Sequence, residues 1–143
     1  MEYSIEVCIK ENQTTTDKGR ILEDLTREIL KQQQYEVYQT IRVTGIEIDV
    51  WAKHKITGQK IIVECKAWDS PLPGEVIAKL LGNVGLRNVS AGWLITTGSL
   101  SKDAKGIVSE WEDENNKKRN QLAFYTKDRI IDLLVDSHII VSP

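Results

Sequence analysis

Several features that mark large classes of proteins are scarce or missing in this sequence of 143 residues. It has two cysteines, Cys8 and Cys65, too few for a disulfide framework or a cysteine-based metal knuckle. We expect each to be a small apolar residue of a protein kept in a reducing compartment, the cytoplasm. No apolar run approaches the roughly 20 residues that a membrane-spanning helix needs. The acidic N-terminus MEYSIEVCIKENQ also lacks the basic and apolar regions of a secretory signal, so we expect no membrane partner.

A strong excess of charge of either sign is missing as well. The formal net charge of -2 argues against binding of nucleic acid through overall charge. A local basic groove stays open, because about six phosphate contacts need only a handful of lysines and arginines. The hydrophobic content of 41% is ordinary for a globular protein. We therefore expect a single domain over 1–143 with its core over about 17–136, and excision from a longer protein stays open.

The spacing of apolar residues in the first half predicts one helix among several strands. Residues 3–9 alternate as a strand does, and Asp17 is a candidate N-cap of a helix that runs to about Gln33. Residues 35–43 follow as a strand, and residues 46–54 and 59–67 read as a hairpin around Thr57-Gly58.

The second half alternates helices with strands. The prolines of DSPLPG predict a loop, and helices are expected over 74–87, after Ser99 or Ser101, and over 127–136. Strands are expected over 91–98 and 121–126. Helices that alternate with strands after an initial meander predict an α/β fold, with a central mixed β-sheet flanked by α-helices.

The hairpin carries charged residues on one of its two faces. If Thr57-Gly58 is a two-residue turn, the numbers of opposed residues sum to 115, which places Trp51 opposite Glu64 and Asp49 opposite Lys66. One face is then apolar, and Asp49, Glu64 and Lys66 share the other face within the spacing of cross-strand neighbours.

Two hypotheses explain this charged face. It can be a wet surface decorated with ordinary Glu/Lys pairs, which contribute little. Alternatively, the two carboxylates hold a cation, because they repel each other without one and Mg²⁺ prefers carboxylate and phosphate oxygens. An ion beside an amine supplies the parts needed to hydrolyse a phosphodiester. The helical patterns on both sides favour the second hypothesis, because a covered charged face needs a purpose.

The segments GIEIDV (45–50) and VECKAW (63–68) resemble the PD-(D/E)XK nucleases, and within them the Mrr-like restriction endonucleases. GRILEDLTREIL (19–30) is similar to the first helix of that family. AGWLITTGSLSKDAK (91–105) and QLAFYTKDRIIDLL (121–134) are similar to its later strands and helices. The resemblance covers about residues 17–136 and implies a restriction-endonuclease-like fold.

The resemblance also implies an activity and a set of site residues. Asp49, Glu64 and the backbone carbonyl of Cys65 would bind Mg²⁺, with Mn²⁺ able to substitute, and Lys66 would position or activate a water. Glu23 matches an acidic residue of the first helix that holds a water or a second ion. The implied function is hydrolysis of DNA phosphodiesters in prokaryotic restriction or anti-phage defence.

Some predictions concern partners and contacts. Many members of the family carry a glutamine on the helix after the ExK strand, whereas this sequence has Glu75 and Lys79 there. Lys53, Lys55 and Lys79 are candidate nucleic-acid contacts, and a solvated surface is the alternative for each. Cutting both DNA strands needs two sites, so we expect a homo-oligomer or a larger multidomain protein. Two other functions stay open: a catalytically inactive nucleic-acid-binding module of this fold, and a nuclease that acts on RNA or branched DNA.

Overall fold

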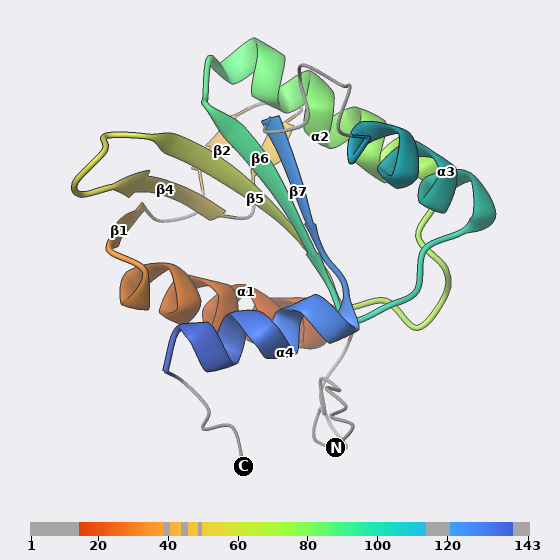
Figure 1. Ribbon diagram of the computed structural model, residues 1–143, viewed down its shortest axis with the longest axis horizontal. Helices are drawn as coiled ribbons and strands as arrows, with labels where there is room; N and C mark the ends of the chain where they lie inside the picture. Colours follow the sequence, from red (N-terminus) through yellow and green to blue (C-terminus); the bar gives the residue numbers. More distant parts are fainter. Residues whose placement is uncertain (1–14, 39–40, 44–45, 49, 114–120, 139–143) are drawn as a thin grey trace.

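A five-stranded mixed sheet in the order β1-β4-β5-β6-β7 forms the middle layer of the protein (Figure 1). The computed structural model describes residues 15–38, 41–43, 46–48, 50–113 and 121–138. The strands of the sheet are β1 (Tyr35–Tyr38), β4 (Val50–His54), β5 (Lys60–Lys66), β6 (Ala91–Thr96) and β7 (Leu122–Tyr125). β4 pairs antiparallel with β1 and β5, whereas β6 pairs parallel with β5 and β7. β5 is therefore the central strand.

In the described ranges four helices cover the sheet, two on each face (Figure 1). α1 (Thr15–Gln32) and α4 (Lys127–Asp136) pack on one face, where Val50, Ala52 and Cys65 point toward them. α2 (Gly74–Arg87) and α3 (Lys102–Trp111) pack on the other face over Ile62 and Leu94. The structure thus confirms the α/β fold with helices on both faces, and none of its helices in the described ranges is long and apolar enough to cross a bilayer.

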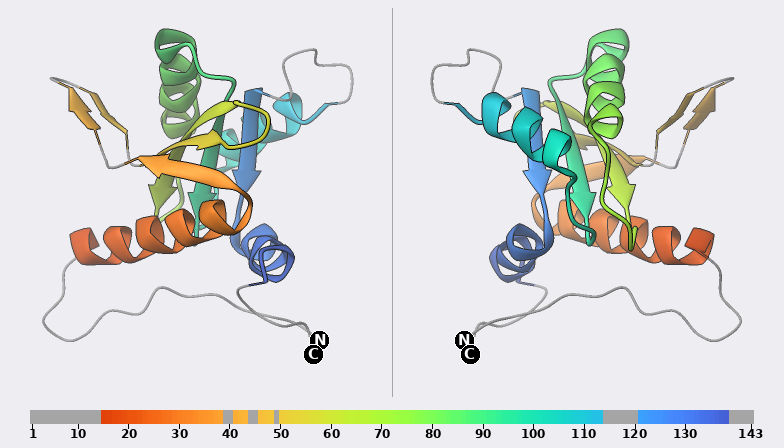
Figure 2. Two further views of the ribbon diagram at one scale, coloured as in Figure 1. Left: turned by 90° about the vertical axis from the view of Figure 1, so that its left-hand side faces the viewer. Right: turned by 90° about the vertical axis from the view of Figure 1, so that its right-hand side faces the viewer.

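The segment expected as one strand over 35–43 divides into strands of two different sheets. β1 ends at Tyr38, and β2 (Ile41–Val43) pairs with β3 (Ile46–Ile48) in a separate two-stranded sheet. Figure 2 shows this small sheet projecting to one side of the layered body. The apolar alternation continues across the division, so periodicity alone did not reveal that the chain changes its pairing partner.

The β4–β5 hairpin corrects the predicted register. Val50 pairs with Val63, and Trp51 pairs with Ile62 rather than with Glu64, so the numbers of opposed residues sum to 113. The connection is longer than two residues because the backbone N–H of His54 donates to the Gln59 carbonyl oxygen at 2.8 Å. A shift of two residues leaves every side chain on its predicted face. The division into an apolar and a charged face therefore holds for β5.

Other predictions are confirmed or corrected at element boundaries. α2 and α4 span the predicted ranges, and Ser101 is the N-cap of α3, with its side chain accepting a hydrogen bond from the Ala104 N–H. α1 begins at Thr15, so the prediction of Asp17 as N-cap is wrong. The run NQTTTD contains several residues able to cap a helix, so the sequence did not single out the first turn. The strand predicted over 3–9 lies outside the described residues.

Candidate active site

The site is centred on Glu64 and Lys66 of β5, whose side chains share the face that α2 covers. Residues two apart on a strand point to the same side. Glu64 is 8% exposed, and the Lys66 Nζ lies 3.1 Å from the Glu64 Oε1. Both sides of the sheet are covered, so this ion pair does not lie on an open wet surface.

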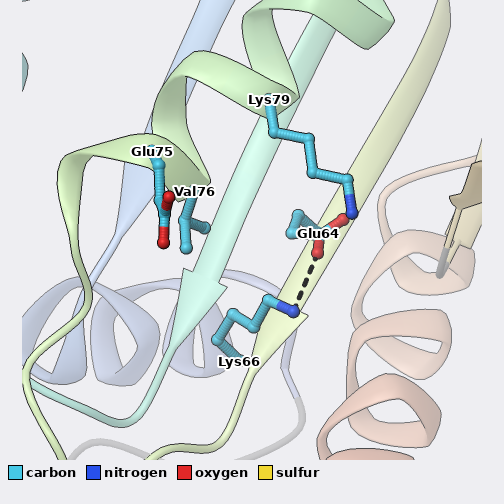
Figure 3. Close-up of a pocket in the computed structure, with 5 residues that line it drawn as sticks. All are labelled: Glu64, Lys66, Glu75, Val76 and Lys79. Atoms are coloured by element: carbon cyan, nitrogen blue, oxygen red, sulfur yellow. Dashed lines mark ion pairs between the residues drawn. The ribbon is translucent and has the colours of Figure 1, made fainter.

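A cavity of about 390 Å³ lies between this pair and α2, and it is lined by Glu64, Lys66, Glu75, Val76 and Lys79. In Figure 3 the Lys79 side chain extends from α2 toward the Glu64 carboxylate, while Lys66 reaches the same carboxylate from β5. Lys66 and Lys79 thus line the same cavity, and the Lys66 amine forms the ion pair with Glu64. The lining of the cavity therefore combines the amines of Lys66 and Lys79 with the carboxylates of Glu64 and Glu75.

The chain between β5 and α2 brings the first turn of α2 to the cavity, where Glu75 and Val76 line it. Pro73 is the N-cap residue, with φ −76° and ψ 159°. The extended backbone of Pro73 is a suitable start for a helix at Gly74. Leu72 is tied to the loop after β6, because its N–H donates to the Ser99 carbonyl oxygen at 2.9 Å. Glu75 and Lys79, one turn apart, then face the cavity together.

The carboxyl end of β5 is held by a hydroxyl of the neighbouring strand. Thr96 is fully buried, and its Oγ1 donates to the Lys66 carbonyl oxygen at 2.6 Å and accepts from the Gly98 N–H at 3.0 Å. The last backbone pair of the β5–β6 ladder is Lys66 with Thr96. Hydrophobic periodicity does not reveal this role of Thr96, although a polar residue that ends an apolar buried strand is a usable signal.

Cys65 lies between the two charged residues and points to the opposite face. Its side chain is buried, and its Sγ is 3.4 Å from the Thr26 Oγ1 of α1. The prediction of a small buried residue is confirmed for Cys65. The prediction that its backbone carbonyl binds a metal ion stays a prediction.

The structure does not bring every predicted residue to the cavity. Glu23 is on α1, which covers the other face of the sheet, and its carboxylate lies 3.9 Å from the Arg27 guanidinium. Asp49 lies outside the described residues. Its neighbour Val50 pairs with Val63, the residue before Glu64. The roles of Asp49 and Glu23 therefore stay predictions.

The three candidate nucleic-acid contacts divide into two groups. Lys79 lines the cavity. Lys53 is exposed and pairs with Lys60 at the start of β5, about 13 Å along the strand from Glu64. Lys55 is exposed in the turn beyond Lys53, still farther toward the hairpin tip. A contact by Lys53 or Lys55 would therefore involve DNA well away from the cavity.

The donor atoms at the cavity suit a hard divalent cation. Among the described residues no group of three or more His, Cys, Asp or Glu side chains converges on a metal position. Mg²⁺ does not need such a cage, because it keeps several waters and binds through one or two carboxylates plus phosphate oxygens. The buried Glu64 carboxylate, with Glu75 lining the same cavity, meets that smaller requirement.

The five-stranded mixed sheet with helices on both faces is a restriction-endonuclease-like fold. The chain belongs to the Mrr catalytic-domain family, described as restriction endonuclease, whose model matches residues 16–134. No match was found among curated proteins.

Two solved structures share the fold. One is a crystal structure of a protein of unknown function, AF1548, with a TM-score of 0.54 and 17% identity; the match covers 81% of this chain and 64% of that one. The other is the DNA modification-dependent restriction endonuclease AspBHI, with a TM-score of 0.53 and 12% identity; the match covers 95% of this chain and 40% of that one. The chain thus spans less than two thirds of the length of either protein.

Proposed function

We propose that this chain is the catalytic domain of a Mg²⁺-dependent endonuclease that hydrolyses DNA phosphodiester bonds in restriction or anti-phage defence. Family membership supports the nuclease type, because restriction endonuclease domains act on DNA and typically use divalent metal ions. The observation that carries the proposal is the Glu64–Lys66 pair, which is largely withdrawn from solvent yet faces a cavity.

A partly buried ion pair contributes little net free energy to folding. The desolvation of two charges offsets much of their attraction, so an apolar pair of similar volume often serves stability better. The Glu64 side chain is 11% exposed and the Lys66 side chain 25%. A functional use of the charges explains their retention on the central strand better than a stabilising one does.

Each residue has a proposed part in hydrolysis. Glu64 would hold Mg²⁺ together with Asp49 and the Cys65 carbonyl oxygen, and the bound ion would neutralise negative charge on the phosphate. The Lys66 amine, 3.1 Å from Glu64, would orient the attacking water by a hydrogen bond. Lys79 would bind a phosphate oxygen from the opposite wall of the cavity, and Glu23, on the other face of the sheet, is given no part in this step.

The partners follow from this activity. The substrate is DNA, which the domain meets in the cytoplasm. Because cutting both strands of a duplex needs two sites, we propose that the domain works as a homo-oligomer or within a larger multidomain protein. The solved proteins of this fold, both longer than the chain, are consistent with the second arrangement.

The test is nicking of supercoiled plasmid DNA with Mg²⁺ or Mn²⁺, with and without EDTA. Wild type should nick the plasmid only with metal, and Lys66→Ala and Glu64→Gln should each lower the rate by about 10²-fold or more. Lys31→Ala is the matched control, because Lys31 is exposed in the last turn of α1 on the other face. Equal rates in wild type and Lys66→Ala would overturn the assignment of the site.

A substrate panel extends this test to the other candidate functions. Duplex DNA, single-stranded RNA and a branched DNA junction are offered at equal phosphate concentration. We expect cleavage of duplex DNA to be fastest. Faster cleavage of RNA or of the junction would change the proposed substrate, and binding without cleavage of any member would indicate an inactive binding module.

A further inference from the structure

Trp68 follows the active-site strand and places its ring beside the Lys66 amine. The Lys66 Nζ lies 5.3 Å from the centroid of the Trp68 ring, within the range of a cation–π contact. Trp68 is 41% exposed, so burial of its ring is incomplete. The Trp68 ring thus contacts the charged amine from a partly exposed position at the end of the strand.

The backbone that carries Trp68 is fixed from two sides. On one side, the Lys18 Nζ of α1 forms a 2.7 Å ion pair with the Asp69 carboxylate, and the Lys18 side chain is only 13% exposed. On the other side, Gly98 packs so closely that an added Cβ would lie 2.6 Å from the Trp68 carbonyl oxygen. The backbone at Trp68 is therefore held chiefly by its packing against Gly98, because the Asp69 side chain of the ion pair is 88% exposed.

Lys66 has a particular need for such support. A lysine side chain loses rotamer freedom when it is held in one conformation. In the structure its amine is held by Glu64, but Glu64 is the carboxylate proposed to bind Mg²⁺. A carboxylate that binds a cation attracts the amine less, whereas the attraction of the Trp68 ring for the amine is unchanged.

We propose that Trp68 is a positioning residue, which keeps the Lys66 amine at the cavity when Glu64 is engaged by a cation. This inference rests on the proposed function, and it adds a residue outside the acid–lysine set. Trp68 acts through Lys66 and needs no contact with DNA. The competing possibility, that the ring stacks on a base of the substrate, makes a different kinetic prediction.

The contact itself is tested without activity, by NMR of metal-free protein labelled at the lysine ε-methylene group. The ring current of Trp68 should move the Lys66 signal upfield of the other lysine signals. The Lys66 signal is assigned as the one that disappears in Lys66→Met. Trp68→Leu should remove the upfield shift and Trp68→Phe should keep part of it. Trp111→Leu is the control, because Trp111 is on α3 and does not line the cavity. An unchanged Lys66 signal in Trp68→Leu would overturn the proposal.

The kinetic consequence is tested by DNA cleavage under saturating Mg²⁺. Trp68→Leu should lower kcat about tenfold with little change in KM, and Trp68→Phe should restore kcat to within about threefold of wild type. Circular dichroism confirms that each variant is folded. A rise in KM with unchanged kcat would contradict positioning of Lys66 and indicate a substrate contact. If wild type does not cleave, the proposed function fails, while the NMR experiment still decides whether Trp68 holds Lys66.

Discussion

At the scale of single residues, the alternation of side chains along β5 places Glu64 and Lys66 on the same face of the sheet. Their neighbours Val63 and Cys65 face the α1 side of the sheet, so the strand buries apolar groups on one face and presents charges on the other. Sequence alternation was sufficient to predict this division, because the period of a strand does not depend on its partners. It could not predict that Lys79 of α2 lines the same cavity, because that placement depends on how the helix packs on the sheet.

Thr96 offers a test of how the end of β5 is held. Replacing it by valine removes the hydroxyl but keeps the shape, so the Lys66 carbonyl and the Gly98 N–H lose their buried partner. We expect Thr96→Val to lower the free energy of unfolding by about 2–3 kcal/mol, measured by urea denaturation. Thr96→Ser keeps the hydroxyl and should lose about 1 kcal/mol. Equal stability of the two variants would show that the hydroxyl does not hold the strand.

At the scale of elements, the β4–β5 hairpin shows where sequence prediction stops. The N–H groups of Ile56 and Thr57 both donate to the His54 Nδ1 at 3.2 Å, and Gly58 adopts a left-handed conformation with φ +73°. Residues 55–58 therefore form a longer turn than the two-residue turn expected at Thr57-Gly58. The side chain of His54 helps decide the register, and such a contact is not visible in hydrophobic periodicity.

Replacing a glycine by alanine is expected to change stability in opposite directions on the two sides of α2. An added Cβ at Gly82 or Gly85 meets nothing within 4 Å, whereas one at Gly92 of β6 would lie 2.6 Å from the Val84 Cγ2. We expect Gly85→Ala to raise the free energy of unfolding by about 0.5–1 kcal/mol, because alanine favours a helix. Gly92→Ala should lower it by about 1–3 kcal/mol through overpacking against α2. Thermal unfolding of both variants checks the pair, and a destabilised Gly85→Ala would contradict an open outer face of α2.

At the scale of the whole molecule, the sheet separates two hydrophobic clusters, and the charged cavity lies beside only one of them. The α1–α4 side contains an aromatic group in which Trp93 contacts both Tyr35 and Tyr125, with ring centroids 5.9 and 5.1 Å apart. The α2–α3 side contains the charged cavity beside its apolar residues. The order of helices and strands along the chain was sufficient to predict that helices cover both faces of the sheet. It did not predict the small β2–β3 sheet.

The aromatic group makes stability depend on pH in the alkaline range. Burial raises the pKa of Tyr35 above its ordinary value of 10.0, and burial followed by repulsion from Tyr35 raises the pKa of Tyr125. A raised pKa favours the protonated folded form. This contribution to stability is therefore complete below pH 10 and is lost as the pH rises through the folded pKa values.

Urea denaturation at about pH 8 and about pH 11 measures this effect. We expect the free energy of unfolding to fall less between these pH values in Tyr125→Phe than in wild type. The comparison of one variant with wild type removes the common effect of other groups that titrate in the same range. An equal fall in both proteins would show that Tyr125 does not contribute.

The central claim is that Glu64 binds the cation that hydrolysis requires, and binding of Mn²⁺ in place of Mg²⁺ tests it most directly. Metal-free protein is titrated with Mn²⁺, and free Mn²⁺ is followed by electron paramagnetic resonance, with EDTA to show reversal. We expect wild type to bind Mn²⁺. Glu64→Gln should bind it at least about tenfold more weakly, because a neutral amide replaces a carboxylate ligand. Equal Mn²⁺ binding by wild type and Glu64→Gln would contradict the claim.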